Sequence, residues 1–166
     1  MNNRAPCTQV LLLSCYELGH QPFSLASTLG FLEREGVKAA AIDLAVEPMS
    51  AYASRIEAAR LVAISAPMHT VLRLGTVAAR QVREFNADVH VCFFGYYADL
   101  NAEHLLRCSY ADSIIAGEFE PALLALVLEV LQCEFDPAIP PLGVRTAEYV
   151  SAPLIQIGRA SCRERV

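Results

Sequence analysis

The loop at residues 16–20, YELGH, holds the residues best placed for chemistry near the start of the chain. It follows an apolar run that ends at Ser14 and Cys15, and Pro22 comes shortly after it. Loops between a buried strand and a helix are where α/β proteins hold ligands. The imidazole of His20 could ligate a metal or act as a base near neutral pH. A solvated loop residue is the favoured interpretation of His20, and direct ligand contact stays open.

Three further segments place polar, glycine and aromatic residues directly after apolar runs. They are SAPMH at residues 65–69, GYYA at 95–98 and GEFE at 117–120. Because apolar runs of roughly four to eight residues are typical of buried strands, each segment is expected where a strand ends. The four segments contain the candidate ligand-contacting residues: Tyr16, Glu17, Leu18, Gly19, His20, Ser65, Pro67, Met68, His69, Gly95, Tyr96, Tyr97, Gly117, Glu118, Phe119 and Glu120.

An alternation of strands and helices must position these segments. Near-continuous apolar runs predict strands at residues 9–15, 37–44, 60–67, 88–95 and 112–118. Helical patterns predict helices at residues 22–36, 50–59, 70–86, 101–110 and 120–132. Such alternation is typical of a parallel sheet with helices on both faces. The expected fold is α/β, a doubly wound, flavodoxin-like and Rossmann-like sheet of five parallel strands in the order 2-1-3-4-5.

Composition limits the classes of function. The chain has 166 residues, 54% of them hydrophobic, so one domain with a sizeable core is expected. A formal charge of -5 and the lack of a basic patch argue against nucleic-acid binding. No apolar run approaches the ~18 residues of a membrane span, and the N-terminus lacks the apolar segment of a signal peptide. We therefore expect a cytoplasmic protein with no nucleic-acid or membrane partner.

The six cysteines, at positions 7, 15, 92, 108, 133 and 162, include no CxxC pair. Most have strand-like or helix-like neighbours, so we expect mostly buried thiols in a reducing compartment. Cys15 is the most site-like, because it stands at the mouth of the first strand. A buried structural role is nevertheless the favoured interpretation of its thiol.

Three common functions of this fold are excluded at the predicted strand ends. A phosphate-accepting receiver domain needs acidic residues after strand one, an aspartate after strand three and a lysine after strand five. This chain has Ser14 and Cys15, Ser65, and Gly117 with Glu118 at those places. A dinucleotide site needs GxGxxG after strand one, where only one glycine occurs. The same loop is unlike the Ser/Thr-rich phosphate loop of a flavodoxin.

The whole set of strand ends resembles the cobalamin (vitamin B12)-binding-type domain that precedes the barrel in many radical S-adenosylmethionine enzymes. The resemblance covers residues 9 to about 130 and rests on the order and spacing of three features. These are Ser65 ending strand three, Gly95 after strand four, and GEFE at 117–120, which is similar to the family's Gly-Glu-x-Glu turn. YELGHQPF and GEFEP are most similar to a bacterial subgroup with a CUAEP/CCAEP tail. The resemblance implies a corrinoid held by the four loop segments.

The family also has a motif that reports how cobalt is held. Its histidine-ligating members carry Asp-x-His-x-x-Gly after strand one, with the aspartate orienting the imidazole. Centred on His20, the pattern meets Leu18 in place of the aspartate and Phe23 in place of the glycine. We therefore expect a corrinoid to bind base-off without His20 as its ligand. No metal-ligating cluster is expected, because His69, His90 and His104 are scattered.

Each candidate residue also has a structural interpretation. Ser65 either ends a strand and caps the next helix or contacts a nucleotide tail. Gly95 and Gly117 serve a positive φ or the close approach of a ligand. Tyr96 and Tyr97 form either a cofactor wall or, as we favour, an exposed docking surface for another domain.

Glu118 and Glu120 have two interpretations as well. They contact a ligand, or they stand where a helix N-terminus favours acidic residues. A cofactor-free interaction or scaffold domain is therefore the alternative function, and the absent Asp-x-His-x-x-Gly motif favours it.

The chain divides into four predicted parts. Residues 1–8 are an N-terminal tail, 9–132 the cobalamin-binding-like domain, and 133–156 a proline-bearing linker toward a missing radical S-adenosylmethionine barrel. Residues 157–166, IGRASCRERV, resemble a translated sequencing adapter, and we interpret them as a non-native tail.

The expected partner is therefore the barrel of a longer parent enzyme. No CxxxCxxC motif occurs in the 166 residues, so the [4Fe-4S] cluster and S-adenosylmethionine are expected only in the missing C-terminal part. We expect no catalytic residue in the chain itself. A surface at Tyr96 and Tyr97 without its barrel is expected to promote self-association.

Overall fold

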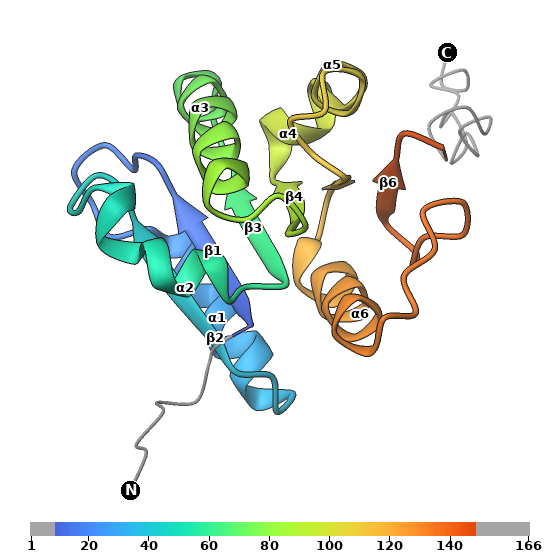
Figure 1. Ribbon diagram of the computed structural model, residues 1–166. Coiled ribbons are helices and arrows are strands. Elements are labelled where there is room, and N and C mark those ends of the chain that lie inside the picture. The colour runs from blue at the N-terminus through green and yellow to red at the C-terminus, as the bar shows by residue number, and fades with distance from the viewer. Residues whose placement is uncertain (1–8, 149–166) are drawn as a thin grey trace, which may run out of the picture.

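The computed structural model describes residues 9–148, and these form one mixed sheet flanked by helices (Figure 1). The strands are β1 (Val10–Ser14), β2 (Ala39–Asp43), β3 (Leu61–Ser65), β4 (His90–Phe94), β5 (Ser113–Ile115) and β6 (Val144–Thr146). The helices are α1 (Phe23–Arg34), the 3-10 helix η1 (Met49–Tyr52), α2 (Ala53–Glu57), α3 (His69–Phe85), α4 (Tyr96–Leu100), α5 (Ala102–Arg107) and α6 (Phe119–Gln132).

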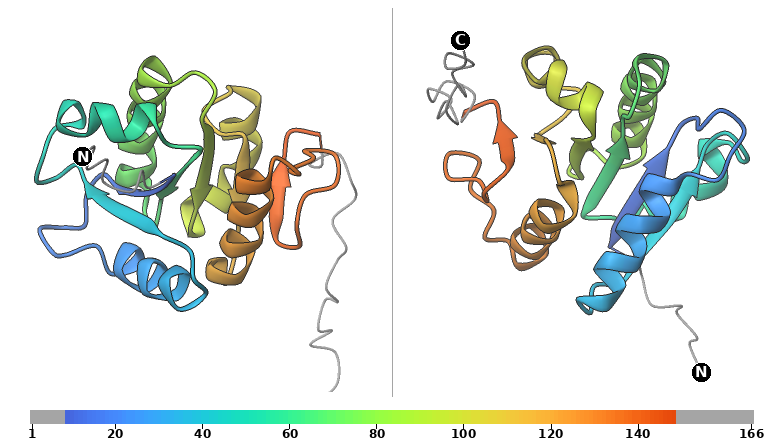
Figure 2. Two further views of the ribbon diagram at one scale, coloured as in Figure 1. Left: turned by 60° about the horizontal axis from the view of Figure 1, so that its bottom comes forward. Right: turned by 180° about the vertical axis from the view of Figure 1, so that it is seen from behind.

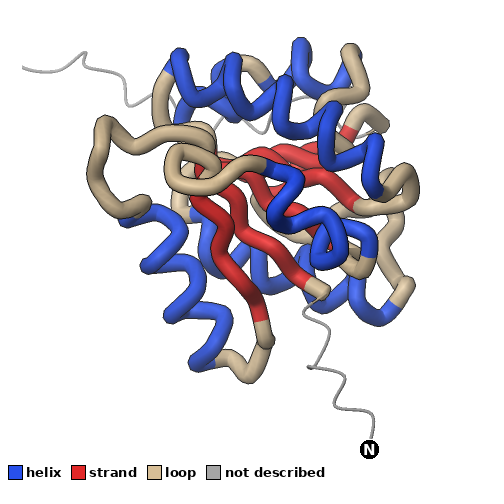
Figure 3. Tube along the Cα trace, turned by 60° about the vertical axis from the view of Figure 1, so that its left-hand side comes forward, coloured by secondary structure: helices blue, strands red, loops and turns tan. Residues whose placement is uncertain are grey.

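Alternating side chains of each central strand build two separate cores. Leu11 and Leu13 of β1 pack with the residues under α2, α3, α4 and α5, whereas Val10 and Leu12 pack with those under α1 and α6. Every residue of β1 and β3 is buried, as expected for parallel strands covered on both sides. The tube and the rotated ribbons show helices on both faces of the sheet (Figures 2 and 3). The α/β, doubly wound expectation is confirmed.

The number of strands was predicted wrongly. Within residues 9–148, the sheet has six strands in the order β2-β1-β3-β4-β5-β6, so the expected order 2-1-3-4-5 describes only its parallel part. The sixth strand runs antiparallel to β5, pairing Ser113 with Thr146 and Ile115 with Val144. It lies within residues 133–156, the predicted linker. Its three residues, VRT, are too few to show a period of two in the sequence.

The predicted helices also differ in detail. The helix expected at 101–110 is the shorter α5, and a second short helix, α4, lies just before it in residues expected to be a loop; the two helices meet at Asn101. Asn101 Nδ2 donates to the Tyr97 carbonyl at 2.8 Å, so the amide stabilises the end of α4. Helix α4 begins directly after Gly95, at the edge of the sheet where the candidate residues lie.

Some predicted segments fall outside the structural description. The N-terminal tail at 1–8 and the adapter-like tail at 157–166 lie outside the described residues, as do residues 149–156 of the predicted linker. Within residues 9–148, no helix is long and apolar enough to cross a membrane.

Candidate functional site

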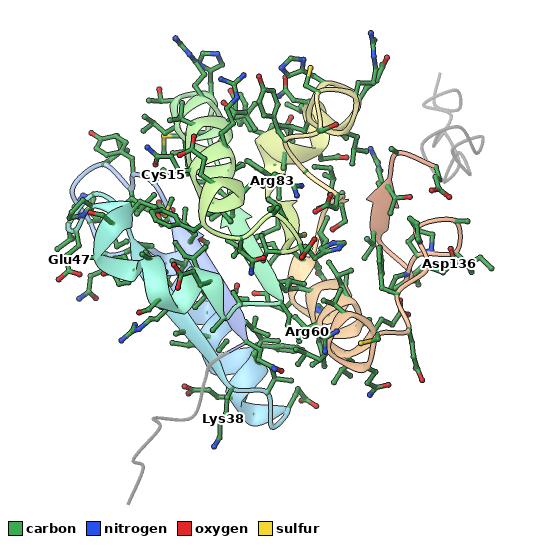
Figure 4. The ribbon with its side chains drawn as sticks, viewed as in Figure 1. Cys15, Lys38, Glu47, Arg60, Arg83 and Asp136 are labelled. Carbon is green, nitrogen blue, oxygen red and sulfur yellow. The ribbon has the colours of Figure 1, made fainter. Side chains whose placement is uncertain are left out.

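The carboxyl ends of the parallel strands bring the four predicted loop segments to one edge of the sheet. Strands β2 and β3 pair with opposite sides of β1, so the chain reverses its direction of winding between β1 and β3. Doubly wound sheets bind ligands in the crevice at such a switch point. Cys15 marks this end of β1, and Arg60 lies beside α6 at the other end of the sheet (Figure 4).

The loop after β1 is a tight turn with an exposed tip. The His20 amide donates to the Glu17 carbonyl at 2.9 Å, while Leu18 and Gly19 have φ of 53° and 80°. Leu18 is 63% exposed, and His20 is exposed as well. Residue 18 therefore carries an apolar side chain in a left-handed conformation, which costs about 1 kcal/mol or more and is uncommon outside functional loops. The solvated-loop interpretation of His20 agrees with this position.

Two serines end the strands that flank the switch point, and both face α1. Ser14 and Ser65 are buried. Ser65 Oγ lies 2.9 Å from Ser24 Oγ of α1, and Ser24 Oγ donates to Glu17 Oε1 at 3.4 Å. Because the carboxylate only accepts, Ser65 donates to Ser24. Ser65 does not cap the next helix, which begins at His69 with Met68 as its N-cap.

The hydroxyl of Ser14 has no such partner. Its Oγ is buried and makes no hydrogen bond to any of the described residues. An unpaired buried hydroxyl costs about 1–3 kcal/mol, so it needs an explanation, and a bound water, ion or ligand is one. Ser14, Ser24 and Thr28 were not among the predicted contacts. The signal for the two helical hydroxyls was the spacing in SLAST, where Ser24 and Thr28 lie one helical turn apart on the face toward the sheet.

The start of α6 is joined to α1 by a side-chain hydrogen bond. Ser27 Oγ of α1 donates to Glu120 Oε1 at 3.0 Å, and the Phe119 ring lies 4.8 Å from that of Phe94. Gly117 has φ 66°, and a Cβ there would meet no atom within 4 Å. Glu118 is exposed and is the N-cap of α6, without a side-chain capping bond. Glu120 thus has a defined partner on α1.

The loop that follows β3 and the loop that follows β4 contact each other through backbone atoms. Gly95 has φ 105°, and a Cβ there would lie 3.1 Å from the Ala66 carbonyl oxygen. The Tyr97 amide donates to that oxygen at 3.1 Å. The ring centroids of Tyr97 and His69 are 6.4 Å apart. Glycine is therefore required at this approach, as the sequence suggested.

The two tyrosines do not form a uniformly exposed pair. Tyr96 is 67% exposed, whereas Tyr97 is half-buried against the core under α3 and α4. Pro67 and Met68 are also half-buried. Four large apolar side chains are exposed at this edge, those of Tyr16, Leu18, Phe23 and Tyr96.

The described cysteines divide evenly, so the expectation of mostly buried thiols holds for only two of four. Cys15 and Cys92 are buried, and Cys108 and Cys133 are exposed. Burial, with a smaller contribution from the Asp43 carboxylate, raises the pKa of Cys15 to about 12. That thiol is a poor nucleophile and a poor metal ligand. Within residues 9–148, no group of three or more His, Cys, Asp or Glu side chains could hold a metal ion.

Comparison with known proteins gives structural neighbours alone. No protein-family model matches the chain, and no curated protein matches it. The chain is similar to the radical S-adenosylmethionine methyltransferase TsrM from Kitasatospora setae, solved with tryptophan substrate and a SAM analogue and also with cobalamin and a [4Fe-4S] cluster. In both cases the TM-score is 0.67 and the identity 18%, over 82% of this chain.

The match covers only part of the neighbour. The chain spans 28% and 27% of the two TsrM chains. A second likeness, to a chain of the RPS4 and RRS1 TIR domain heterodimer, has a TM-score of 0.55 at 16% identity and covers 76% of this chain and 98% of that one. At such identities these likenesses show a Rossmann-like fold, shared by domains of different function.

Proposed function

We propose that this chain is the cobalamin-binding-like domain of a radical S-adenosylmethionine enzyme and that it holds a corrinoid at the carboxyl edge of its sheet. The observation that carries the proposal is the buried, unpartnered hydroxyl of Ser14 at the switch point. The fold likeness to a cobalamin-containing neighbour supports the class of domain.

The residues at this edge fit such a group. Ser14, Ser24 and Ser65 offer hydroxyls to the polar nucleotide tail of a corrinoid, and Ser14 has hydrogen-bonding capacity to spare. The glycine turns at Gly95 and Gly117 let backbone approach a ligand closely. The exposed apolar residues Tyr16, Leu18, Phe23 and Tyr96 would cover the apolar rim of a macrocycle. The bound corrinoid would supply alkyl-group or radical chemistry.

We further propose that cobalt has no ligand from His20. The loop lacks the aspartate that would orient an imidazole, with Leu18 in its place. The proposal also includes the rest of the longer parent enzyme. Its C-terminal barrel would hold the [4Fe-4S] cluster and S-adenosylmethionine, and it would contact the exposed edge at Tyr96.

A cofactor-free scaffold domain is the second candidate, and one observation favours it. The Ser24–Ser65 and Ser27–Glu120 hydrogen bonds join α1 to β3 and to α6, so most of the polar groups at this edge already have partners. In this alternative the same edge only docks another domain, and the hydroxyls serve to hold α1 in place.

Titration with hydroxocobalamin, followed by desalting and visible absorption, tests the proposal. We expect about one corrinoid per chain, a spectrum unchanged in His20→Ala, and affinity at least tenfold weaker in Ser14→Val, which replaces the hydroxyl by a bulkier apolar group. Ser14→Ala removes an unpaired hydroxyl and should raise the free energy of unfolding of the corrinoid-free chain by about 1 kcal/mol or more. The exposed Ser54→Ala of α2 is the control. Loss of corrinoid on desalting from the unmodified chain favours the scaffold alternative.

A further inference from the structure

The sixth strand is connected to the candidate site through one ion pair. Arg145 of β6 lies between two buried neighbours, Val144 and Thr146, and its Nη1 is 2.7 Å from Asp99 Oδ1 of α4. Both side chains are about one-third exposed, at 33% and 32%. Asp99 Oδ1 itself is buried and has no hydrogen bond to the described residues beyond this charge contact. Arg145 is thus the cation that compensates a buried carboxylate oxygen.

The helix that carries Asp99 also carries the tyrosines of the site. Helix α4 is a single five-residue segment, YYADL, that starts at Tyr96. The Asp99 amide donates to the Gly95 carbonyl at 3.2 Å, and the Tyr97 amide to that of Ala66. The position of α4 therefore sets both the exposed Tyr96 ring and the contact with the loop after β3. With so short a helix, a side-chain anchor at its C-terminal half has a large influence on its orientation.

The other side of β6 is anchored as well. Gly143, immediately before the strand, has φ 86°, and a Cβ there would lie 3.1 Å from that of Ala122 in α6. The strand is hydrogen-bonded to β5, which precedes the loop at Gly117. Strand β6 therefore braces two of the four loop segments, those that lead into α4 and α6.

We infer that Arg145 is a positioning residue, through which β6 holds α4 and its tyrosines in the geometry of the candidate site. The inference rests on the proposed function for its link to a corrinoid, and on the ion pair for its link to α4. Displacement of β6 from β5 would therefore remove the ion pair that holds α4. The sequence placed this segment in a linker, without any role at the site.

Hydrogen exchange followed by mass spectrometry on the full chain tests the link to α4 without any corrinoid. Arg145→Met keeps the length of the side chain and removes its charge, and we expect exchange in residues 95–101 to become at least fivefold faster. Asp99→Asn should give a smaller increase, because it removes the charge that needs compensation. The control is Arg107→Met, which breaks the exposed Arg107–Glu103 pair of α5, with side chains 78% and 72% exposed.

A charge-reversed pair separates positioning from simple loss of packing. Arg145→Asp combined with Asp99→Arg should restore slow exchange in 95–101, whereas either substitution alone should not. Unchanged exchange in Arg145→Met, or fast exchange in the reversed pair, would overturn the role of Arg145.

The corrinoid titration then decides the connection to the site. If the unmodified chain retains corrinoid, Arg145→Met should weaken binding at least fivefold, with Arg107→Met within twofold of the unmodified chain. Equal affinity in Arg145→Met, despite fast exchange in α4, would overturn the connection. If the unmodified chain retains no corrinoid, the proposed function fails. The hydrogen-exchange data alone then test whether Arg145 positions α4.

Discussion

The two ends of the sheet differ in how their polar side chains are bonded and in how many apolar side chains they expose. At the amino end, polar side chains are engaged with backbone: Asn86 Nδ2 donates to the carbonyls of Ile56, Glu57 and Ala59, and Arg60 donates to those of Val130 and Leu131 at the end of α6. At the carboxyl end, Ser14 Oγ has no hydrogen bond to the described residues, and four large apolar side chains face solvent. The first end stabilises the fold through these bonds, and the second is the one to which the proposed function assigns a ligand.

A cavity at the amino end sharpens this contrast. It measures about 370 Å³ and lies among His90, Asp112 and Phe135. The polar groups there already have partners: His90 Nε2 lies 2.8 Å from Ser113 Oγ, and the Asp112 carboxylate accepts from Arg83. Among the described residues, Arg83 Nε at this end is also buried without a hydrogen bond, so neither the cavity nor an unpaired polar atom alone distinguishes the two ends. The exposed apolar side chains of the carboxyl end do so.

The largest expected effect comes from removing an amino-end carboxylate. Asp112 accepts two 2.9 Å contacts from Arg83 Nη2 and one bond of 2.7 Å from the Val91 amide. Asp112→Ala should lower the free energy of unfolding by about 3 kcal/mol, because it leaves a partly buried guanidinium unpaired. Urea denaturation measures this. Glu103→Ala, in the exposed pair with Arg107, should cost less than about 0.5 kcal/mol. A similar loss of unfolding free energy in Asp112→Ala and Glu103→Ala would show that the amino-end bonds do not stabilise the fold more than an exposed ion pair does.

A backbone position at the carboxyl end should give an intermediate effect. Gly95→Ala introduces a Cβ at φ 105° and 3.1 Å from the Ala66 carbonyl oxygen, and should cost about 1–2 kcal/mol. Gly30→Ala, in the middle of α1 with no atom within 4 Å of its added Cβ, should stabilise by about 0.5–1 kcal/mol. Thermal melts of both variants show whether the carboxyl edge depends on its glycine; equal Tm values would argue that it does not.

The smallest effect concerns pH. Burial lowers the pKa of His90 below its ordinary 6.5, with Asp112 opposing and Arg83 assisting the shift. The unfolded chain then binds the proton more readily, so this contribution to stability is present above pH 6.5 and is lost as the pH falls toward the folded pKa. The urea midpoint of the unmodified chain should decrease as the pH is lowered from about 7.5 to about 5.5, and that of His90→Asn should decrease less. If the urea midpoints of the two proteins decrease equally with pH, His90 does not contribute to the pH dependence of stability.

Much of the fold could be predicted because the parallel strands are long apolar runs. VLLLS and LVAIS identify β1 and β3 directly, and the strand-end loops follow from them. Strand β6 could not be predicted, since VRT is held by pairing with β5 and by the contact of Arg145 with Asp99, both far along the chain.

The candidate site was predictable at the level of loops and less so at the level of side chains. Strand alternation placed Ser65 at an edge, but its bond to Ser24 depends on how α1 packs across β1 and β3. Tyr96 and Tyr97 are adjacent in sequence, yet the turn of α4 buries one and exposes the other. Ser14 was missed as a contact because its environment, rather than its type, makes it unusual.

The hydrogen bond between Ser24 and Ser65 has a kinetic consequence. Together with the Ser27–Glu120 bond, it keeps α1 against β3 and α6. If the proposed corrinoid reaches the Ser14 hydroxyl from the side of α1, that helix must first separate from these partners. The rate of uptake would then be limited by this opening and would stop rising at high corrinoid concentration.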